Sequence, residues 1–133
     1  MQLLNKKIKI AMIAHDGKKA DMVSFVMKRL EFFKSVSVEV VATGTTGKHL
    51  IHAGLNNVHT MLSGPMGGDA EIASMITKNQ IDAVIFFIDS MEAHPHQVDV
   101  NMLLRICNVH DIPLATNYKT GKMVIDSLES SLG

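Results

Sequence analysis

Two patterns of apolar residues alternate along this chain. The first is a short and nearly continuous apolar run, which is typical of a strand buried on both faces of a parallel sheet. We predict five such strands, at 7–14, 38–42, 58–62, 81–88 and 112–116. The run at 81–88, IDAVIFFI, is the most strongly apolar of them.

Between these runs, apolar residues return at spacings of three and four, which is the pattern of a helix that buries one face. The pattern is clear between Gly17 and Lys34, where it is carried by Val23, Val26, Met27, Leu30 and Phe33. We predict helices at 17–34, 46–54, 68–80, 98–110 and 121–131.

Strands that alternate with helices predict a parallel sheet covered by helices on both faces. Each gap between predicted strands exceeds about a dozen residues, which is long enough for a crossover between parallel strands. We therefore predict a Rossmann-like, three-layer α/β domain with a five-stranded, mainly parallel sheet. Because no repeat, low-complexity tract or linker interrupts the pattern, we expect one domain over residues 1–133.

The composition is typical of a globular protein with a substantial apolar core. Of the 133 residues, 47% are hydrophobic, and 13 basic residues balance 13 acidic ones. This balance argues against nucleic acid and anionic membranes as partners, and no apolar run is long enough to span a membrane. The single cysteine, Cys107, excludes an internal disulfide and fits a cytoplasmic protein. We interpret Cys107 as a core residue.

The conspicuous polar residues all follow predicted strands. They are His15 and Asp16, TGTTG (43–47), SGPMGGD (63–69), Asp89, and the pair Thr116 and Asn117. In an open parallel sheet, ligands bind in the crevice outside the carboxyl ends of the strands. Five separate segments are therefore predicted to meet at one edge.

The segment TGTTG has the composition of an anion site. Gly44 and Gly47 allow the backbone to approach a ligand closely. Thr45 and Thr46 offer hydroxyl and N–H groups at a helix N-terminus, where the dipole favours an anion. An ordinary strand-to-helix turn with a threonine cap has the same composition, and the alternative stays open. The chain has neither a P-loop nor the glycine pattern of a dinucleotide site.

The segment HDGKK (15–19) adds charges of both signs beside this loop. Asp16 either caps the helix that follows or faces the crevice. Lys19 lies about one turn into that helix and can direct its ammonium group back toward the crevice, whereas Lys18 is expected to face water.

The connection at 89–99 contains several metal-ligating residue types. These are Asp89, Glu92, His94, His96 and Asp99. A His-x-His pair beside carboxylates is one arrangement that binds a metal. A polar loop capped by Asp99 is the alternative, and we favour it because no further His or Cys pair lies nearby. We predict neither a metal nor a cofactor.

Four acids, Asp16, Asp69, Asp89 and Asp99, are thus predicted to face one cleft. Clustered carboxylates suit general acid–base chemistry. Beside groups that bind phosphate, they indicate proton abstraction from a small phosphorylated substrate.

Six motifs together resemble one known family. AHDxxK, ATGTTG, SGPMGGD, IFFxD, PHxxDV and IPLATN occur in this order over roughly residues 8–126. With these motifs in this order, the chain resembles the methylglyoxal synthase family. The resemblance implies a lyase that converts dihydroxyacetone phosphate to methylglyoxal and inorganic phosphate without a cofactor, and it implies a homohexamer.

The resemblance also implies which residues carry the reaction. Asp69 matches the catalytic base, which would remove the C3 proton, beside the phosphate ester, before phosphate leaves from the enediolate. His96 is expected near the carbonyl and enediolate oxygens. Asp16 and Asp99 match acids that support proton transfer, and Asp89 matches a nearby carboxylate whose role is less defined.

The residues that match the substrate-binding groups are spread over four segments. They are His15, Lys19, Thr43, Gly44, Thr45, Thr46, Ser63, Gly64 and His96. Those that match phosphate contacts are Lys19, Thr45, Thr46, Ser63 and the backbone N–H of Gly64. Within SGPMGGD, the glycines would let the chain pass close to the ligand, so that the turn presents Asp69.

Two alternatives share this fold. One is the effector domain of carbamoyl-phosphate synthetase, which binds small anions and catalyses nothing, and the other is the nucleotide cyclohydrolase domain of purine synthesis. A binding module needs the threonines and the lysine but has no use for Asp69 together with Asp16 and Asp99. These acids favour the enzyme.

Overall fold

The computed structural model describes residues 7–61, 67–91 and 100–132. Its centre is a five-stranded sheet with the order β3-β2-β1-β4-β5. The strands are β1 (Ile8–Ala14), β2 (Val38–Ala42), β3 (Val58–Thr60), β4 (Ala83–Phe87) and β5 (Leu114–Ala115). Every neighbouring pair is parallel, which confirms the predicted fold and makes the sheet parallel throughout.

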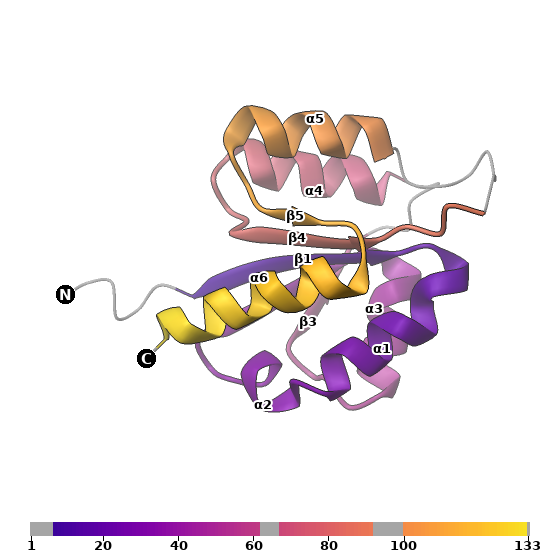
Figure 1. The fold of residues 1–133 in the computed structure, drawn as a ribbon, viewed down its shortest axis with the longest axis vertical. Coiled ribbons are helices and arrows are strands. Elements are labelled where there is room, and N and C mark those ends of the chain that lie inside the picture. Colours follow the sequence, from indigo (N-terminus) through magenta and orange to yellow (C-terminus); the bar gives the residue numbers. More distant parts are fainter. Residues whose placement is uncertain (1–6, 62–66, 92–99, 133) are drawn as a thin grey trace.

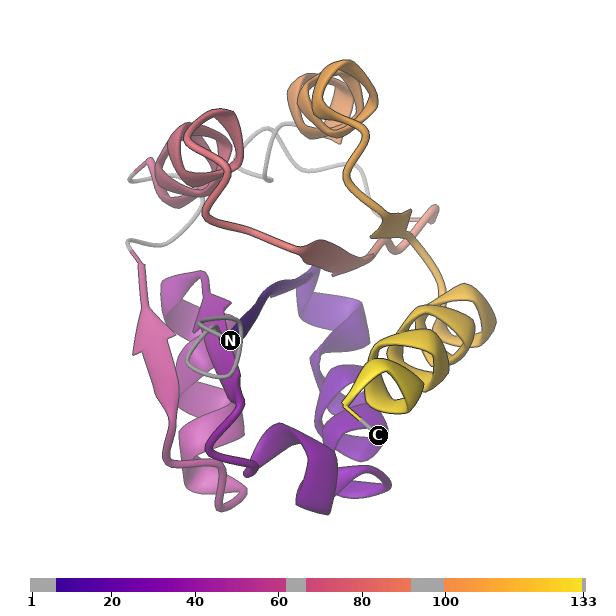
Figure 2. The same ribbon diagram turned by 90° about the vertical axis from the view of Figure 1, so that its left-hand side faces the viewer.

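Helices cover both faces of this sheet (Figures 1 and 2). They are α1 (Lys19–Met27), α2 (Leu30–Phe33), α3 (Gly44–His52), α4 (Gly68–Thr77), α5 (Val100–His110) and α6 (Tyr118–Ser131), with a short 3-10 turn at Asp16–Lys18. Figure 2 shows α4 and α5 above the sheet and α1, α3 and α6 below it. The sheet and the helices on its two faces therefore form the three layers that the sequence predicts.

The predicted helix at 17–34 is wrong as a single element. After the 3-10 turn, α1 ends at Met27 and α2 begins at Leu30. Arg29 leaves the helical conformation, with φ −133° and ψ 36°. Its guanidinium group binds Asp126 and Glu129 of α6, and the change of direction lets Phe32 and Phe33 both be buried.

Two other helices begin earlier than the apolar pattern predicts. The helix α6 starts at Tyr118, because the side chain of Asn117 accepts a hydrogen bond from the N–H of Thr120 at 3.0 Å and so caps the first turn. The helix α3 starts at Gly44, directly after the extended residue Thr43. Both helices therefore begin at the ends of strands, where the polar segments lie.

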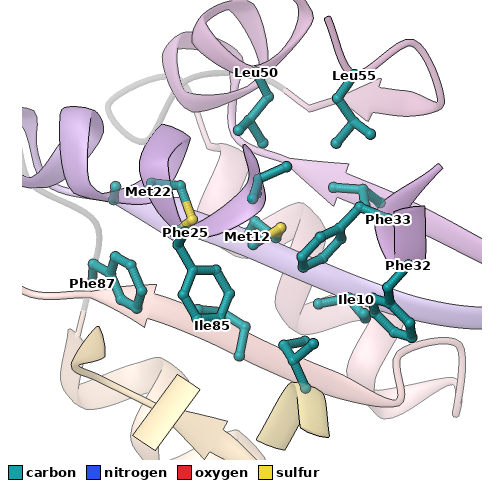
Figure 3. Packing of buried hydrophobic residues seen from close by; sticks show 14 of the residues in the cluster. Ile10, Met12, Met22, Phe25, Phe32, Phe33, Leu50, Leu55, Ile85 and Phe87 are labelled. Carbon is teal, nitrogen blue, oxygen red and sulfur yellow. The ribbon is translucent and has the colours of Figure 1, made fainter. Parts of the chain in front are cut away.

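The core consists of two apolar clusters, one on each face of the sheet. Figure 3 shows the cluster beneath α1, α3 and α6, in which Phe25 lies beside Phe87 and Ile85. The rings of Phe25 and Phe87 meet edge to face at 5.3 Å, and Tyr118 stacks on Phe87 at 5.8 Å. Aromatic packing thus fixes Phe87, the last residue of β4. From there the chain continues to the polar edge, which is the edge of the sheet where the polar segments follow the strands.

Cys107 lies in the other cluster and is 1% exposed. Desolvation by burial raises the pKa of its thiol. This confirms the interpretation of Cys107 as a core residue. Within the part of the chain that the structure describes, no helix has the length and apolar character needed to cross a membrane.

Candidate active site

The carboxyl ends of the parallel strands bring several of the predicted site residues that the structure describes to one edge of the sheet. Figure 1 shows β1 and β4 running toward the side on which α1 begins. His15 follows β1, Thr43 follows β2, and Asp89 lies two residues after β4. Because the register of neighbouring parallel strands aligns their ends, the fold juxtaposes segments that are far apart in sequence.

His15 is the most constrained polar side chain of this edge. It is 5% exposed, and its ring meets the ring of Phe86 edge to face at 5.2 Å. Its Nδ1 accepts a hydrogen bond from the backbone N–H of Asp89 at 2.9 Å. Since an N–H group only donates, Nδ1 carries no proton, and the neutral ring bears its hydrogen on Nε2.

The Nε2 atom of His15 is buried and has no hydrogen-bond partner among the described residues. A buried donor without an acceptor costs about 1–3 kcal/mol, so such groups call for an explanation. A ligand oxygen would satisfy this N–H. His15 thus has the chemistry of a substrate-binding donor.

The ammonium group of Lys19 lies at the end of β1. Its Nζ donates to the carbonyl oxygen of Ala14 at 2.8 Å and to Asp16 Oδ1 at 2.8 Å, and the side chain is only 11% exposed. Lys18 instead forms an ion pair with Asp21 at 3.8 Å on the outer side of α1. The fold therefore retains the charge of Lys19, and not that of Lys18, beside the polar edge.

The segment TGTTG forms the first turn of α3. Thr43 and Thr46 are buried, and their hydroxyl oxygens lie 3.4 Å apart. Thr45 is exposed on the same turn. Thr43 occupies the N-cap position, but among the described residues no side chain caps the N–H groups of this turn. These N–H groups, together with the helix dipole, can therefore serve an anion.

Asp69 lies in the first turn of α4. The residue before this helix, Gly67, has φ 101°, a left-handed conformation that glycine adopts without steric cost. The Oδ1 atom of Asp69 accepts a hydrogen bond from the N–H of Ala70 at 2.9 Å. The glycine-rich segment thus ends in a turn that delivers a carboxylate to a helix N-terminus.

Four of the predicted site residues, Ser63, Gly64, His96 and Asp99, lie outside the described residues, as does His94. Within the described ranges, no group of three or more His, Cys, Asp or Glu side chains is arranged to hold a metal ion. The predicted residues that the structure does place are His15, Asp16, Lys19, Thr43, Gly44, Thr45, Thr46, Asp69 and Asp89.

Sequence reasoning missed Ala14, although both of its backbone groups bind residues of the site. Its N–H donates to Thr46 Oγ1 at 3.2 Å, and its carbonyl oxygen accepts from Lys19. An alanine carries no functional group, so no signal in its side chain could have indicated this role.

Comparison with known proteins agrees with this geometry. The family model described as "MGS-like domain" matches residues 21–116. The methylglyoxal synthase of Bacillus mycoides (strain KBAB4) is 51% identical over 122 residues, which is 92% of either chain, and that of Bacillus anthracis (strain A0248) matches equally.

A solved structure gives the same result. The crystal structure of methylglyoxal synthase from Elizabethkingia anophelis NUHP1 superposes with a TM-score of 0.83 at 42% sequence identity, and the match covers 89% of this chain and 76% of that one. The resemblance inferred from the six motifs is thereby confirmed, and the chain belongs to the methylglyoxal synthase family.

Proposed function

We propose that this chain is a lyase that converts dihydroxyacetone phosphate to methylglyoxal and inorganic phosphate. The observation that supports the proposal is that Lys19 and the first turn of α3 lie at the carboxyl ends of β1 and β2, while Asp69 stands in the first turn of α4, the helix that follows β3. A base beside two phosphate-binding elements suits proton abstraction from a phosphorylated substrate.

Asp69 acts as the base in this proposal. We place the abstraction at the hydroxymethyl carbon and not, as the resemblance had led us to expect, at the carbon that carries the phosphate ester. Only this choice gives an enediolate whose electrons can expel the phosphate group. Loss of a hydroxymethyl proton gives an enediolate in which the C–O bond to phosphate is allylic. The enediolate electrons then expel phosphate and leave the enol of methylglyoxal, which tautomerises to the dicarbonyl product.

The remaining groups bind and orient the substrate. Lys19 and the first turn of α3, which contains Thr45, hold the phosphate and fix the angle at which its bond leaves the enediolate plane. The Nε2–H of His15 donates to a substrate oxygen and stabilises charge that develops there. Asp16 and Asp99 support proton transfer, and His96 adds a second donor near the enediolate. Neither a metal nor a cofactor enters these steps.

A direct assay tests the proposal. Purified protein is incubated with dihydroxyacetone phosphate, the dicarbonyl is trapped with an aromatic diamine, and phosphate release is measured in parallel. We expect equal amounts of both products, at a rate far above that of the Asp69→Asn variant and of buffer, since the substrate also decomposes slowly on its own. Binding of the substrate without turnover would instead identify a regulatory anion-binding module.

We also propose that the chain forms a homohexamer in the cytoplasm and has neither nucleic acid nor membranes as partners. Several large apolar side chains are strongly exposed in the single chain, namely Val36 (88%), Met91 (93%), Val109 (68%) and Met123 (69%). Contacts between subunits would remove such surface from water. Light scattering is expected to give about six times the 14.6 kDa of one chain, and a monomer mass would contradict the proposal.

A further inference from the structure

Asp89 uses both its backbone and its side chain at the polar edge. Its N–H donates to His15 Nδ1 at 2.9 Å. Its Oδ1 accepts a hydrogen bond from the N–H of Met91, two residues later, at 3.0 Å. The second contact is an Asx turn, in which a side-chain oxygen takes the place of a backbone carbonyl and curves the chain.

His15 is held against the end of β4 by one backbone contact and two contacts of its ring. The backbone N–H of His15 donates to the carbonyl oxygen of Phe87 at 3.2 Å. Phe86 meets the imidazole edge to face, and the N–H of Asp89 binds Nδ1. The first contact holds the main chain of His15 and the second orients its ring, but only the third distinguishes the two nitrogen atoms of the ring.

The position of the Asp89 N–H depends on the path of the chain beyond β4. The N–H of Ile88 donates to the carbonyl oxygen of Thr116 at 3.3 Å, which fixes the chain just before Asp89. On the other side, the Asx turn fixes the chain from Asp89 to Met91. Within the described residues, loss of this turn would leave the peptide that contacts His15 anchored on one side only.

We propose that Asp89 is a positioning residue, whose carboxylate holds its own N–H on His15 Nδ1 so that His15 presents Nε2–H as a neutral donor to the substrate. In this role the carboxylate transfers no proton. The inference rests on the proposed function for the identity of the substrate. The tautomer of the His15 ring, by contrast, is a property of the protein without substrate. A neutral imidazole polarises a carbonyl group through its hydrogen bond.

Two substitutions separate this role from acid–base chemistry. Asp89→Asn removes the charge but keeps an oxygen that accepts from the N–H of Met91. Asp89→Ala removes the acceptor. We expect Asp89→Asn to lose less than about tenfold in kcat, and Asp89→Ala to lose roughly 10²-fold with a smaller change in KM, since misplacing a positioned group by about 1 Å has effects of this size. Equal loss in both variants would overturn the proposal.

Nitrogen-15 NMR of the histidine rings provides a readout that needs no turnover. In the parent protein and in Asp89→Asn at neutral pH, we expect the shift of an unprotonated nitrogen at Nδ1 of His15 and that of a protonated one at Nε2. The signals are assigned by their disappearance in His15→Gln. In Asp89→Ala we expect the two shifts to move toward each other as the tautomers mix.

These results also separate the proposal from the proposed function. If the chain failed to convert dihydroxyacetone phosphate but showed the expected shifts, the ring assignment would stand and the function would fall. A protonated Nδ1 in the parent protein would overturn the inference whatever the activity. Should Asp89→Ala fail to fold, Asp89→Ser, which forms a weaker turn of the same kind, is expected to fall between the parent and full loss.

Discussion

The hydroxyl oxygen of Thr46 accepts a hydrogen bond from the backbone N–H of Ala14 at 3.2 Å and so joins the first turn of α3 to the end of β1. The carbonyl oxygen of the same alanine accepts from Lys19 Nζ at 2.8 Å. Two elements of the proposed phosphate site are therefore placed through one residue of the central strand. Because the Thr46 hydroxyl oxygen is used in this way, we expect Thr46 to offer the ligand its backbone N–H.

The contact between Thr46 and Ala14 is expected to stabilise the fold. Thr46→Val keeps the shape of the side chain but leaves the buried N–H of Ala14 without an acceptor, which should lower the free energy of unfolding by about 1–3 kcal/mol. Thr46→Ser keeps the oxygen and should lose less. Urea unfolding measures both.

Thr45→Val is the matched control, because Thr45 is exposed in the same turn. It should leave the unfolding free energy within about 0.5 kcal/mol of the parent value while raising the KM for substrate. If Thr46→Val proved as stable as the parent protein, the hydrogen bond to Ala14 would contribute nothing measurable to the free energy of unfolding.

Lys19 is expected to bind the phosphate group, so inorganic phosphate should inhibit by competing with substrate. Lys19→Gln removes the charge and should weaken phosphate binding roughly tenfold to a hundredfold, as the loss of a charged hydrogen bond of about 1.5–3 kcal/mol implies. Lys18→Gln, in which an exposed pair with Asp21 is lost, should change the inhibition constant little. Equal effects of the two substitutions would remove Lys19 from the site.

The sequence predicted the layers of this fold because β1 and β4 are buried on both faces and therefore read as continuous apolar runs. It did not predict the break between α1 and α2. Leu30 and Phe33 continue the helical spacing across the break, so the local pattern gives no sign of it. The partner of Arg29 at the break includes Glu129, 100 residues later, and such a contact has no local signature.

In the candidate site, too, features with a local pattern could be predicted and contacts between residues far apart in sequence could not. The positions of His15 and Lys19 after β1, and of Asp69 at the start of α4, could be predicted because polar residues that follow strands gather at one edge of a parallel sheet, and their roles stay predictions. The hydrogen bond from Asp89 to His15 joins residues 74 positions apart, and it uses a backbone group that every residue except proline carries. For this reason the sequence indicated Asp89 as one more carboxylate and gave no indication of its contact with the histidine.

Gly47 is expected to be required because of its neighbour in β3. A Cβ atom on Gly47 would overlap Cγ2 of Thr60. Alanine is favoured over glycine in a helix by about 1 kcal/mol, so two effects oppose each other. We expect Gly47→Ala to destabilise the parent protein but to stabilise Thr60→Ser, which lacks the methyl group.

A double-mutant cycle measured by thermal or urea unfolding gives the coupling between these two positions. For residues in direct contact, we expect a coupling of about 0.5–3 kcal/mol. A coupling near zero would show that the side chain of Thr60 turns aside without cost.

Cys107 makes stability depend on pH in the alkaline range. Burial raises the pKa of its thiol in the folded protein, so the folded state holds this proton more tightly than the unfolded chain does. The buried, protonated thiol contributes fully to stability below roughly pH 8.5, the ordinary pKa of a cysteine. This contribution is lost as pH rises toward the pKa in the folded protein, by at most about 1.4 kcal/mol per pH unit. Urea unfolding between pH 7 and 10 should show this loss in the parent protein relative to Cys107→Ala, and parallel profiles would contradict it.

Asp69→Asn is expected to abolish proton abstraction without disturbing the fold. Asparagine is nearly isosteric and its Oδ1 can still accept from the N–H of Ala70, so the melting temperature should stay close to that of the parent protein. Loss of a catalytic base lowers kcat by roughly 10²–10⁴-fold, and phosphate affinity should change little, because Asp69 does not hold that group. Glu71→Gln is the matched control, since Glu71 is the other acid in the first turn of α4.

Exchange with deuterated water tests the same residue one step earlier in the reaction. In the parent protein, deuterium should enter the hydroxymethyl carbon of bound substrate whenever the enediolate is reprotonated before phosphate leaves. Asp69→Asn should show no such exchange, whereas Glu71→Gln should retain it. If Asp69→Asn kept turnover and exchange within about tenfold of the parent values, a loss too small for a catalytic base, the base would be Asp16, Asp99 or another group. The left-handed turn at Gly67 would then serve only to start α4, and its position before an acid would have no catalytic meaning.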